Sequence, residues 1–375
     1  METVREWARM GRAMFGQFLS ESGQADAVTV AEEGMGDGGW GCILEATFSS
    51  GKRLFLLEVR PSGEPRRARE AVNALLVQTH RRPELHPVFV APYISEQAAE
   101  ICREHGIGFM DLAGNCRIAA GGFYVDIRGR PNPFKNTRRL KTLTASKTAR
   151  ILRVLFNHPR RPWKIRDLAA EAGVSLGLVS NAGRILRDRE WIDPGQRRIL
   201  LTRPRELIEY WTTSHPPTDR RTFFFTEDDF LCAENKIIDY CNKMGYTCAF
   251  TGISAAVHLA SGIRRYRQVQ VRISGKATIP AEDIGFEPAD PARANVVVIH
   301  SPDLGVFYGM RPIPPVSRLQ YCRPMEKTVA AIEAEARVPM AIVSPVQAYV
   351  DLKTAGDNGG EEAEKVFRQV LEPSW

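Results

Sequence analysis

The stretch WKIRDLAAEAGVSLGLVSNAGRILRDREWI, residues 163–192, contains the strongest local pattern in this chain of 375 residues. The inner face of a short first helix consists of Ile165, Leu168 and Ala169. Gly173 stands where that helix must end, because glycine accepts the left-handed backbone of a C-terminal cap. Ser175 is then placed to cap a second helix. The buried stripe of the second helix is Val179, Ala182, Ile185 and Leu186. The pattern predicts a helix-turn-helix.

The flanking residues extend this motif to a winged helix-turn-helix domain over residues 135–214. ASKTARILRVLFNHP (145–159) predicts a further helix before the pair. Asp-Pro-Gly at 193–195 predicts a turn after it. Arg197 and Arg198 lie near the tip of that turn, before an apolar strand, as the basic residues of a wing do.

Basic residues are concentrated around the same motif. Residues 128–205 contain 20 Lys and Arg against 5 Asp and Glu, a net charge of +15, whereas the rest of the chain has 31 against 39, a net of −8. Such a concentration is typical of a segment that binds a polyanion. We therefore expect double-stranded DNA as a partner; a winged helix that serves only to contact another protein is the alternative.

The candidate DNA contacts fall into two groups. Asn181 and Arg184 lie on the outward face of the second helix, and we expect them to contact bases, since Asn can pair with adenine and Arg with guanine. The other candidates would contact the backbone or support the helix on it. They are Lys164, Arg166, Ser175, Ser180, Arg187, Arg197 and Arg198.

The first segment, residues 1–134, predicts an α/β domain. Expected helices are at about 2–20, 64–78 and 95–105, and the main expected strands are at about 27–33, 42–48, 53–59 and 87–91. The order helix, three strands, helix, strand resembles the restriction-endonuclease-like core of the PD-(D/E)xK nucleases over about residues 1–92.

That resemblance implies a divalent cation between two carboxylates and a lysine that helps the nucleophile. Glu45 and Glu58 would be the carboxylates, but Arg60 stands at the lysine position and stays protonated. A working nuclease, an inactive remnant of the fold and a chance Glu-x-Arg all remain open. We expect the inactive remnant, without a catalytic residue, metal or cofactor. Asp111 and Asn115 flank a glycine turn, and we assign them to turn formation.

Residues 215–375 predict a second α/β domain, which resembles a degenerate nucleotidyltransferase. YTCAFTGISAAVHLASGIRRYRQVQVRIS (246–274) has the pattern strand, glycine turn, helix, strand. Val269 and Val271 occupy the positions where that fold needs carboxylates for Mg²⁺, so phosphoryl transfer is not supported. Ser344 and Gln347 predict a capping box, and Asp351 is expected on a solvated or partner-contacting face of the helix that follows.

Three runs, TGISAAVHL (251–259), SPVQAYVDL (344–352) and EEAEKVF (361–367), together resemble the AbiEi family over about residues 145–375. Its members are antitoxins of type IV toxin–antitoxin systems. The resemblance implies a DNA-binding regulator of its own operon that counteracts a nucleotidyltransferase-like toxin. The family's winged helix usually stands near the N-terminus, whereas a nuclease-like segment precedes it here. A DNA-processing nuclease using Glu45 and Glu58 is the alternative function.

Composition sets the remaining expectations. The seven cysteines include no C-x-x-C pair, the seven histidines form no metal-binding motif, and no apolar run approaches the roughly 20 residues of a membrane span. We expect a cytoplasmic protein with reduced thiols and no membrane contact. A homodimer is a further expectation, because many winged-helix regulators dimerise.

Overall fold

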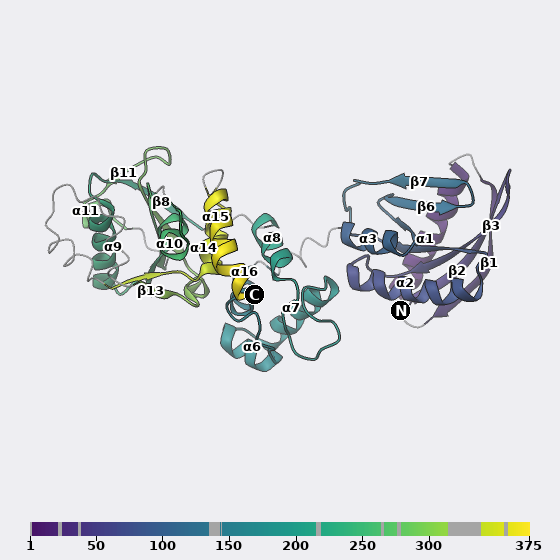
Figure 1. Ribbon diagram of the computed structural model, residues 1–375, viewed down its shortest axis with the longest axis horizontal. Helices are drawn as coiled ribbons and strands as arrows, with labels where there is room; N and C mark the ends of the chain where they lie inside the picture. Colours follow the sequence, from purple (N-terminus) through teal and green to yellow (C-terminus); the bar gives the residue numbers. More distant parts are fainter. Residues whose placement is uncertain are drawn as a thin grey trace. The chain divides into compact units, whose positions relative to one another are not determined.

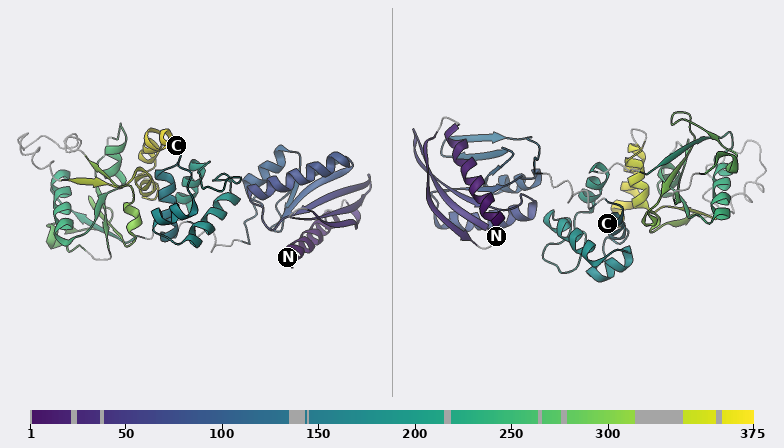
Figure 2. Two further views of the ribbon diagram at one scale, coloured as in Figure 1. Left: turned by 90° about the horizontal axis from the view of Figure 1, so that it is seen from below. Right: turned by 180° about the vertical axis from the view of Figure 1, so that it is seen from behind.

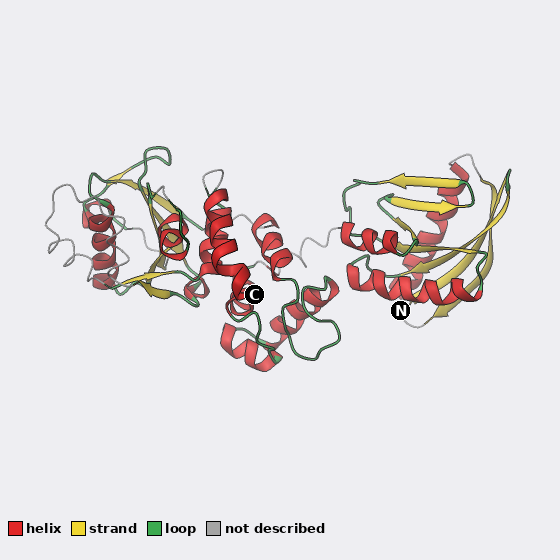
Figure 3. Cartoon of the chain, in the orientation of Figure 1, coloured by secondary structure: helices red, strands yellow, loops and turns green. Residues whose placement is uncertain are grey.

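The computed structural model describes residues 2–21, 25–36, 39–134, 143, 145–214, 219–263, 266–275, 279–313, 339–355 and 359–375. Contacts divide the chain into two compact units. One contains Met1–Thr137 and Arg184–Glu190, and the other contains Arg138–Gly183 and Trp191–Trp375. Both units combine helices with strands, as Figure 3 shows, which confirms the mixed α/β class. No helix among the described residues has the length and apolar character to cross a bilayer.

The N-terminal unit is built around one seven-stranded sheet, whose strands lie in chain order (Figure 1). They are β1 (Ala25–Gly36), β2 (Gly39–Phe48), β3 (Gly51–Val59), β4 (Leu85–Ala91), β5 (Gly108–Asp111), β6 (Cys116–Ala120) and β7 (Phe123–Ile127). Strands β3, β4 and β5 run parallel, and the other neighbours are antiparallel. The helices are α1 (Glu2–Glu21), α2 (Pro65–Arg81) and α3 (Glu96–Glu104). The predicted elements of this segment are confirmed, with ends shifted by a few residues.

Side-chain alternation along β3 gives the sheet a core on each face. Phe55 and Leu57 pack with Phe15 of α1. Figure 2 shows from behind how α1 covers this face of the sheet. Leu56 points the other way, into a cluster with Ile43 and the apolar residues of α2 and α3. Because β3 is covered on both faces, its sequence is a nearly continuous apolar run. This places α1 on one side of the sheet and α2 with α3 on the other.

The second unit begins with a helical segment. The helices of this segment are α5 (Ser146–Asn157), α6 (Ile165–Ala172), α7 (Leu176–Asp188) and α8 (Pro204–Ser214). The residues of α7 from Arg184 onward are grouped with the first unit. Two isolated antiparallel bridges, Trp163 with Ile199 and Ile192 with Leu201, tie the residues after α7 back to this segment. The expected apolar strand after Arg198 is thus reduced to single bridges. Residues 135–142, where the winged-helix segment was expected to begin, and residues 215–218 lie outside the described part of the chain.

The remainder of the second unit contains a seven-stranded mixed sheet in the order β11-β8-β12-β10-β9-β14-β13. Its strands are β8 (Arg221–Phe225), β9 (Cys248–Phe250), β10 (Val269–Ser274), β11 (Glu287–Pro288), β12 (Val296–Ser301), β13 (Arg311–Ile313) and β14 (Met340–Ile342). Its helices are α9 (Phe230–Met244), α10 (Gly252–Leu259), α11 (Ala281–Ile284), η1 (Leu304–Phe307), α14 (Pro345–Lys353), α15 (Gly360–Val366), η2 (Phe367–Leu371) and α16 (Glu372–Ser374). The core cluster includes buried residues of β9, β10 and β12.

The helical segment and the C-terminal helices share aromatic packing. The ring of Phe156 in α5 stacks at 6.0 Å on Trp211 of α8 and lies 5.5 Å from Trp375. Trp375 in turn meets the ring of Phe367 at 5.4 Å. The expected boundary at residues 214–215 therefore falls inside one compact unit.

Candidate nucleic-acid interface

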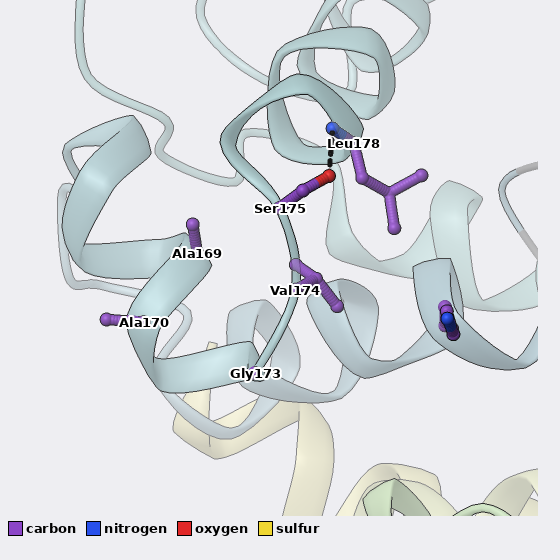
Figure 4. A pocket seen from close by; sticks show the side chains of 7 residues that line it. Ala169, Ala170, Gly173, Val174, Ser175 and Leu178 are labelled. Atoms are coloured by element: carbon purple, nitrogen blue, oxygen red, sulfur yellow. Dashed lines mark hydrogen bonds between the residues drawn. The ribbon is translucent and has the colours of Figure 1, made fainter.

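The turn between α6 and α7 has the predicted geometry. Gly173 adopts φ +62°, its N–H donates to the carbonyl of Ala170, and the N–H of Val174 donates to that of Ala169. These two bonds end α6 as a left-handed glycine cap does. One residue later the Oγ of Ser175 accepts a hydrogen bond of 3.3 Å from the N–H of Leu178, which Figure 4 shows as a dashed line. The local predictions for Gly173 and Ser175 are confirmed.

Helix α7 separates a buried face from an open one. The predicted inner residues Val179, Ala182, Ile185 and Leu186 are all buried. On the opposite face Ser180 and Arg184 are exposed, whereas Asn181 and Arg187 are half-buried. Asn181 and Arg184 already interact with other groups of the protein. To contact bases, both side chains would therefore have to give up these interactions and form hydrogen bonds to DNA in their place.

Four predicted phosphate contacts are open to solvent. Lys164 at the start of α6, Arg166 in its first turn, and Arg197 with Arg198 after α7 are exposed. None of these four forms an ion pair with another described residue. The turn before the two arginines is held by a 2.9 Å bond from the N–H of Gly195 to Oδ1 of Asp193. The segment thus presents cations whose charge no neighbouring carboxylate neutralises.

Lys147 belongs to this surface although the motif did not indicate it. It lies in the first turn of α5 and lines a surface pocket of about 440 Å³ together with residues of the α6–α7 turn (Figure 4). The other lining residues are Ala169, Ala170, Gly173, Val174, Ser175 and Leu178. Because Lys147 precedes the turn by a whole helix, only the fold brings it beside Ser175. An exposed lysine at the start of a helix was the single available signal.

Other basic residues of this segment are used inside the second unit. Nε of Arg150 donates to Oδ1 of Asp303 at 2.7 Å. The hydroxyl of Tyr308 donates to Glu171 of α6 at 2.7 Å, and His158 bonds the same hydroxyl at 2.9 Å. Burial, together with the bond to Glu171, raises the pKa of Tyr308. These contacts fix α5 and α6 to the region of η1, so the net charge of +15 overstates the number of cations available to a ligand.

The two carboxylates of the nuclease-like segment do not converge. In the β2–β3 hairpin Glu45 pairs with Leu54, whereas Glu58 pairs with Gly41. Both glutamates point to the same face of the sheet. Leu54, the partner of Glu45, precedes Glu58 by four residues of β3, so the two glutamates lie roughly 13 Å apart along the strand direction. Glu45 instead forms a 2.6 Å ion pair with Lys52. The expectation that Glu45 and Glu58 could share a cation is wrong, because the register sets them apart.

Glu58 is paired with the arginine that replaces the lysine. Its Oε1 lies 2.9 Å from the guanidinium of Arg60, and both side chains are almost fully buried. Burial raises the pKa of Glu58, and the positive charge of Arg60 opposes that rise only in part. No group of three or more His, Cys, Asp or Glu able to hold a metal occurs among the described residues. Asp111 serves its turn as predicted, since it accepts bonds from the N–H groups of Ala113 and Asn115.

The nucleotidyltransferase-like turn of the second unit is filled by its own side chains. A Cβ on Gly252 would lie 1.7 Å from Oε1 of Gln270, so the Gln270 amide occupies the space above the turn. Arg272 follows Gln270 on the same face of β10. It donates two hydrogen bonds of 2.7 Å to Asp351 and further bonds to Asp219 and Ser301. This cluster buries the guanidinium of Arg272, which is 2% exposed.

Asp351 is buried, contrary to the expectation that it lies on a solvated or partner-contacting face. Asp351 is 4% exposed, and Thr251, Gln347 and Arg272 all donate to it. Burial tends to raise the pKa of Asp351, but the charge and hydrogen bonds of Arg272 outweigh it, so the pKa lies below its usual value. Ser344 caps α14 as predicted. The Gln347 side chain does not close a capping box, because its oxygen accepts a 2.8 Å bond from Arg153 of α5.

Comparison with known proteins gives little direct guidance. No family model matches the chain. No curated protein matches it either. A solved structure described as "Structure of EndoMS in apo form" is similar at 14% sequence identity and a TM-score of 0.21. The match covers 27% of this chain and 45% of that chain, so this chain spans less than half of the solved one.

Proposed function

We propose that this protein is a DNA-binding transcriptional regulator whose contact surface is a winged helix-turn-helix over residues 145–214. The observation that supports it best is the set of exposed, unneutralised cations at Lys164, Arg166, Arg197 and Arg198, beside the open face of α7. Helix α7 would enter the major groove, and the cations before α6 and after α7 would contact phosphates on either side. Arg184 and Asn181 are the proposed base readers and Lys147 is an added phosphate contact.

The finer proposal is an antitoxin of the AbiEi type that represses its own operon. It is supported by the three sequence runs that resemble that family and by the polar cluster that fills the nucleotidyltransferase-like turn. The alternative is a metal-dependent nuclease. The separation of Glu45 from Glu58 and the ion pair between Glu58 and Arg60 count against it.

The test is fluorescence anisotropy of the full chain with labelled DNA from upstream of its own gene, over a salt series. Each lost phosphate contact should lower the slope of log affinity against log salt by about 0.9. We expect Arg197→Ala with Arg198→Ala to lower that slope by about 2 for any DNA sequence. Arg184→Ala should instead reduce discrimination between operator and unrelated DNA by about 1–3 kcal/mol.

A matched control is Arg205→Ala, because Arg205 is also exposed but is paired with Glu209 at 3.0 Å. It should leave the slope unchanged. Two results would contradict the proposed surface: no DNA binding at low salt, or the same change of slope in Arg205→Ala as in the double variant Arg197→Ala, Arg198→Ala. Co-expression with a nucleotidyltransferase-like toxin encoded beside the gene tests the antitoxin role separately, since growth should be rescued only by a neutralising partner.

A further inference from the structure

A second pocket of the second unit, of about 350 Å³, lies between α5, α6 and η1. Its volume is near the lower end of the range for ligand pockets, roughly 300–1,000 Å³, so it suits a small molecule. The polar side chains that line it are Arg150 of α5, Glu171 of α6 and Tyr308, which follows η1. None of the proposed DNA contacts lines this pocket.

Arg150 brings a guanidinium to this pocket in a fixed position. Its stem packs on the backbone of η1 so closely that a Cβ on Gly305 would lie 2.5 Å from Cγ of Arg150. The bond from its Nε to Asp303 holds the side chain there. Nη1 lies 3.6 Å from the place that a Cβ on Gly173 would take, next to the end of α6. Neither terminal nitrogen has a hydrogen-bond partner among the described residues, so both are available to a ligand carboxylate.

Glu171 brings the opposite charge to the same pocket. Its Oε1 accepts the 2.7 Å hydrogen bond from Tyr308, and no described cation forms an ion pair with it. The last carbonyl groups of α6, which ends at Ala172, add partial negative charge beside it. Arg150 and Glu171 line one pocket, yet they form no ion pair with each other. A molecule with a negative and a positive end therefore fits between them.

The other walls of the pocket are largely apolar. Val154 and Phe307 lie at the buried side, and Leu304 stands at the rim with 61% of its surface exposed. Ala170 and Ala172 leave room because their side chains end at Cβ. An apolar group bound here would cover the exposed leucine, which favours binding.

We propose that this pocket binds an apolar α-amino acid. The carboxylate is held by Arg150, the ammonium group by Glu171 and the last carbonyl groups of α6, and the side chain lies against Leu304 and Phe307. The site goes beyond DNA binding and does not depend on it. Because Gly173 also lines the pocket, a bound amino acid contacts the residue that ends α6 ahead of α7.

The test is binding of free amino acids to the full chain, followed by saturation-transfer NMR and by calorimetric titration. The probes are L-leucine, L-valine and L-phenylalanine, with two analogues of leucine that each lack one charge. Leucinamide has no carboxylate, and 4-methylpentanoate has no ammonium group. Each analogue loses charge-assisted hydrogen bonds, so it should bind about 10–100-fold more weakly than L-leucine. The measurement contains no DNA, so its outcome is separate from that of the DNA-binding test.

Variants locate the site. Ala170→Leu should fill the pocket and abolish binding. Glu171→Gln keeps an acceptor for Tyr308 but removes the charge, so L-leucine and 4-methylpentanoate should then bind with similar affinity. Glu227→Gln changes an exposed glutamate outside the pocket and should have no effect.

The comparison of leucine with its analogues is made on the natural sequence, so it does not depend on how a variant folds. The proposal is overturned if none of the three amino acids binds at millimolar concentration, if either analogue binds as tightly as L-leucine, or if folded Ala170→Leu binds L-leucine as tightly as the natural chain.

Discussion

Arg153 and Arg272 are both buried arginines of one polar network. Of the two, Arg272 forms ion pairs with described carboxylates, those of Asp219 and Asp351, whereas Arg153 donates to the Gln347 amide. We predict that Arg272→Met destabilises the second unit by about 3–5 kcal/mol, because it leaves the buried charge of Asp351 without its partner. For a unit of this size that loss corresponds to a fall in melting temperature of about 6–20 °C. Arg153→Met should lower the free energy of unfolding by about 1 kcal/mol or less.

The small effect at Arg153 follows from opposing contributions. Burial, and to a lesser degree the charge of Arg272, lower the pKa of Arg153 from its ordinary value to about 10. The folded state therefore disfavours the charged form, and at neutral pH this costs about 3 kcal/mol. The sign follows from proton linkage: the penalty is present below about pH 10 and is relieved as the pH rises towards the ordinary pKa of an arginine.

The favourable contacts of Arg153 are of similar size. Its bond to Gln347 is worth about 1.5–3 kcal/mol as a charge-assisted hydrogen bond. Its guanidinium also lies 5.4 Å from the ring centre of Trp211, which adds about 1–2 kcal/mol. Methionine keeps an apolar side chain against Trp211 but has no charge. The substitution therefore loses the bond to Gln347 and the contact with the ring, and it removes the cost of burying the charge, so the net change in stability is small.

The assay is thermal and urea unfolding followed by circular dichroism, with Arg293→Met as the control, because Arg293 is an exposed arginine paired with Glu287. Arg272→Met combined with Asp351→Leu should regain most of the stability lost in Arg272→Met alone. Equal losses at Arg153 and Arg272, or a double variant no more stable than the single one, would refute this account of the network.

Three further predictions concern acid stability, the turn and metal. The pKa of Asp351 is lower in the folded protein than its unfolded value of about 3.9, so ionised Asp351 stabilises the fold above that value, and this stability is lost as the pH falls through the folded pKa. Melting temperatures measured against pH should therefore fall below about pH 4. The double variant Arg272→Met, Asp351→Leu should show a smaller fall. Gly173→Ala should cost about 1–2 kcal/mol in urea unfolding because of its left-handed backbone, whereas Gly177→Ala, on an open helix surface, should stabilise by roughly 0.5–1 kcal/mol. Added Mg²⁺ should leave labelled DNA intact with the natural chain and with Glu58→Ala alike; cleavage lost only in Glu58→Ala would restore the nuclease hypothesis.

The sequence predicted those features that depend on nearby residues. A helix end is decided within about four positions, so Gly173 and Ser175 could be assigned correctly from the order of residues alone. The same is true of Asp111, whose carboxylate bonds backbone groups two and four residues further on. The strand expected at about 53–59 was also placed correctly, because its apolar run is continuous along the chain.

Contacts across long sequence distances could not be predicted in this way. The Arg153–Gln347 bond joins residues 194 positions apart, and the Arg272–Asp351 pair spans 79. Helical periodicity around Asp351 is compatible with a solvated face, and only the approach of β10 shows that the face is covered. For Glu45 and Glu58 the strands were assigned correctly, but the hairpin register decides which residues meet, and a turn at Ser49 and Ser50 fixes that register.

The distribution of paired and unpaired charge indicates where the chemistry of this chain lies. In each α/β part a buried carboxylate is matched with an arginine of the chain itself: Glu58 with Arg60, and Asp351 with Arg272. A guanidinium cannot be displaced by a metal without leaving its own charge buried, which costs several kcal/mol. Both pairs therefore favour structural roles over metal-dependent catalysis. Four exposed cations that lack a described carboxylate partner, Lys164, Arg166, Arg197 and Arg198, stand on the helix-turn-helix segment, where a polyanion could reach them. For this reason DNA binding is the function we expect experiments to find first.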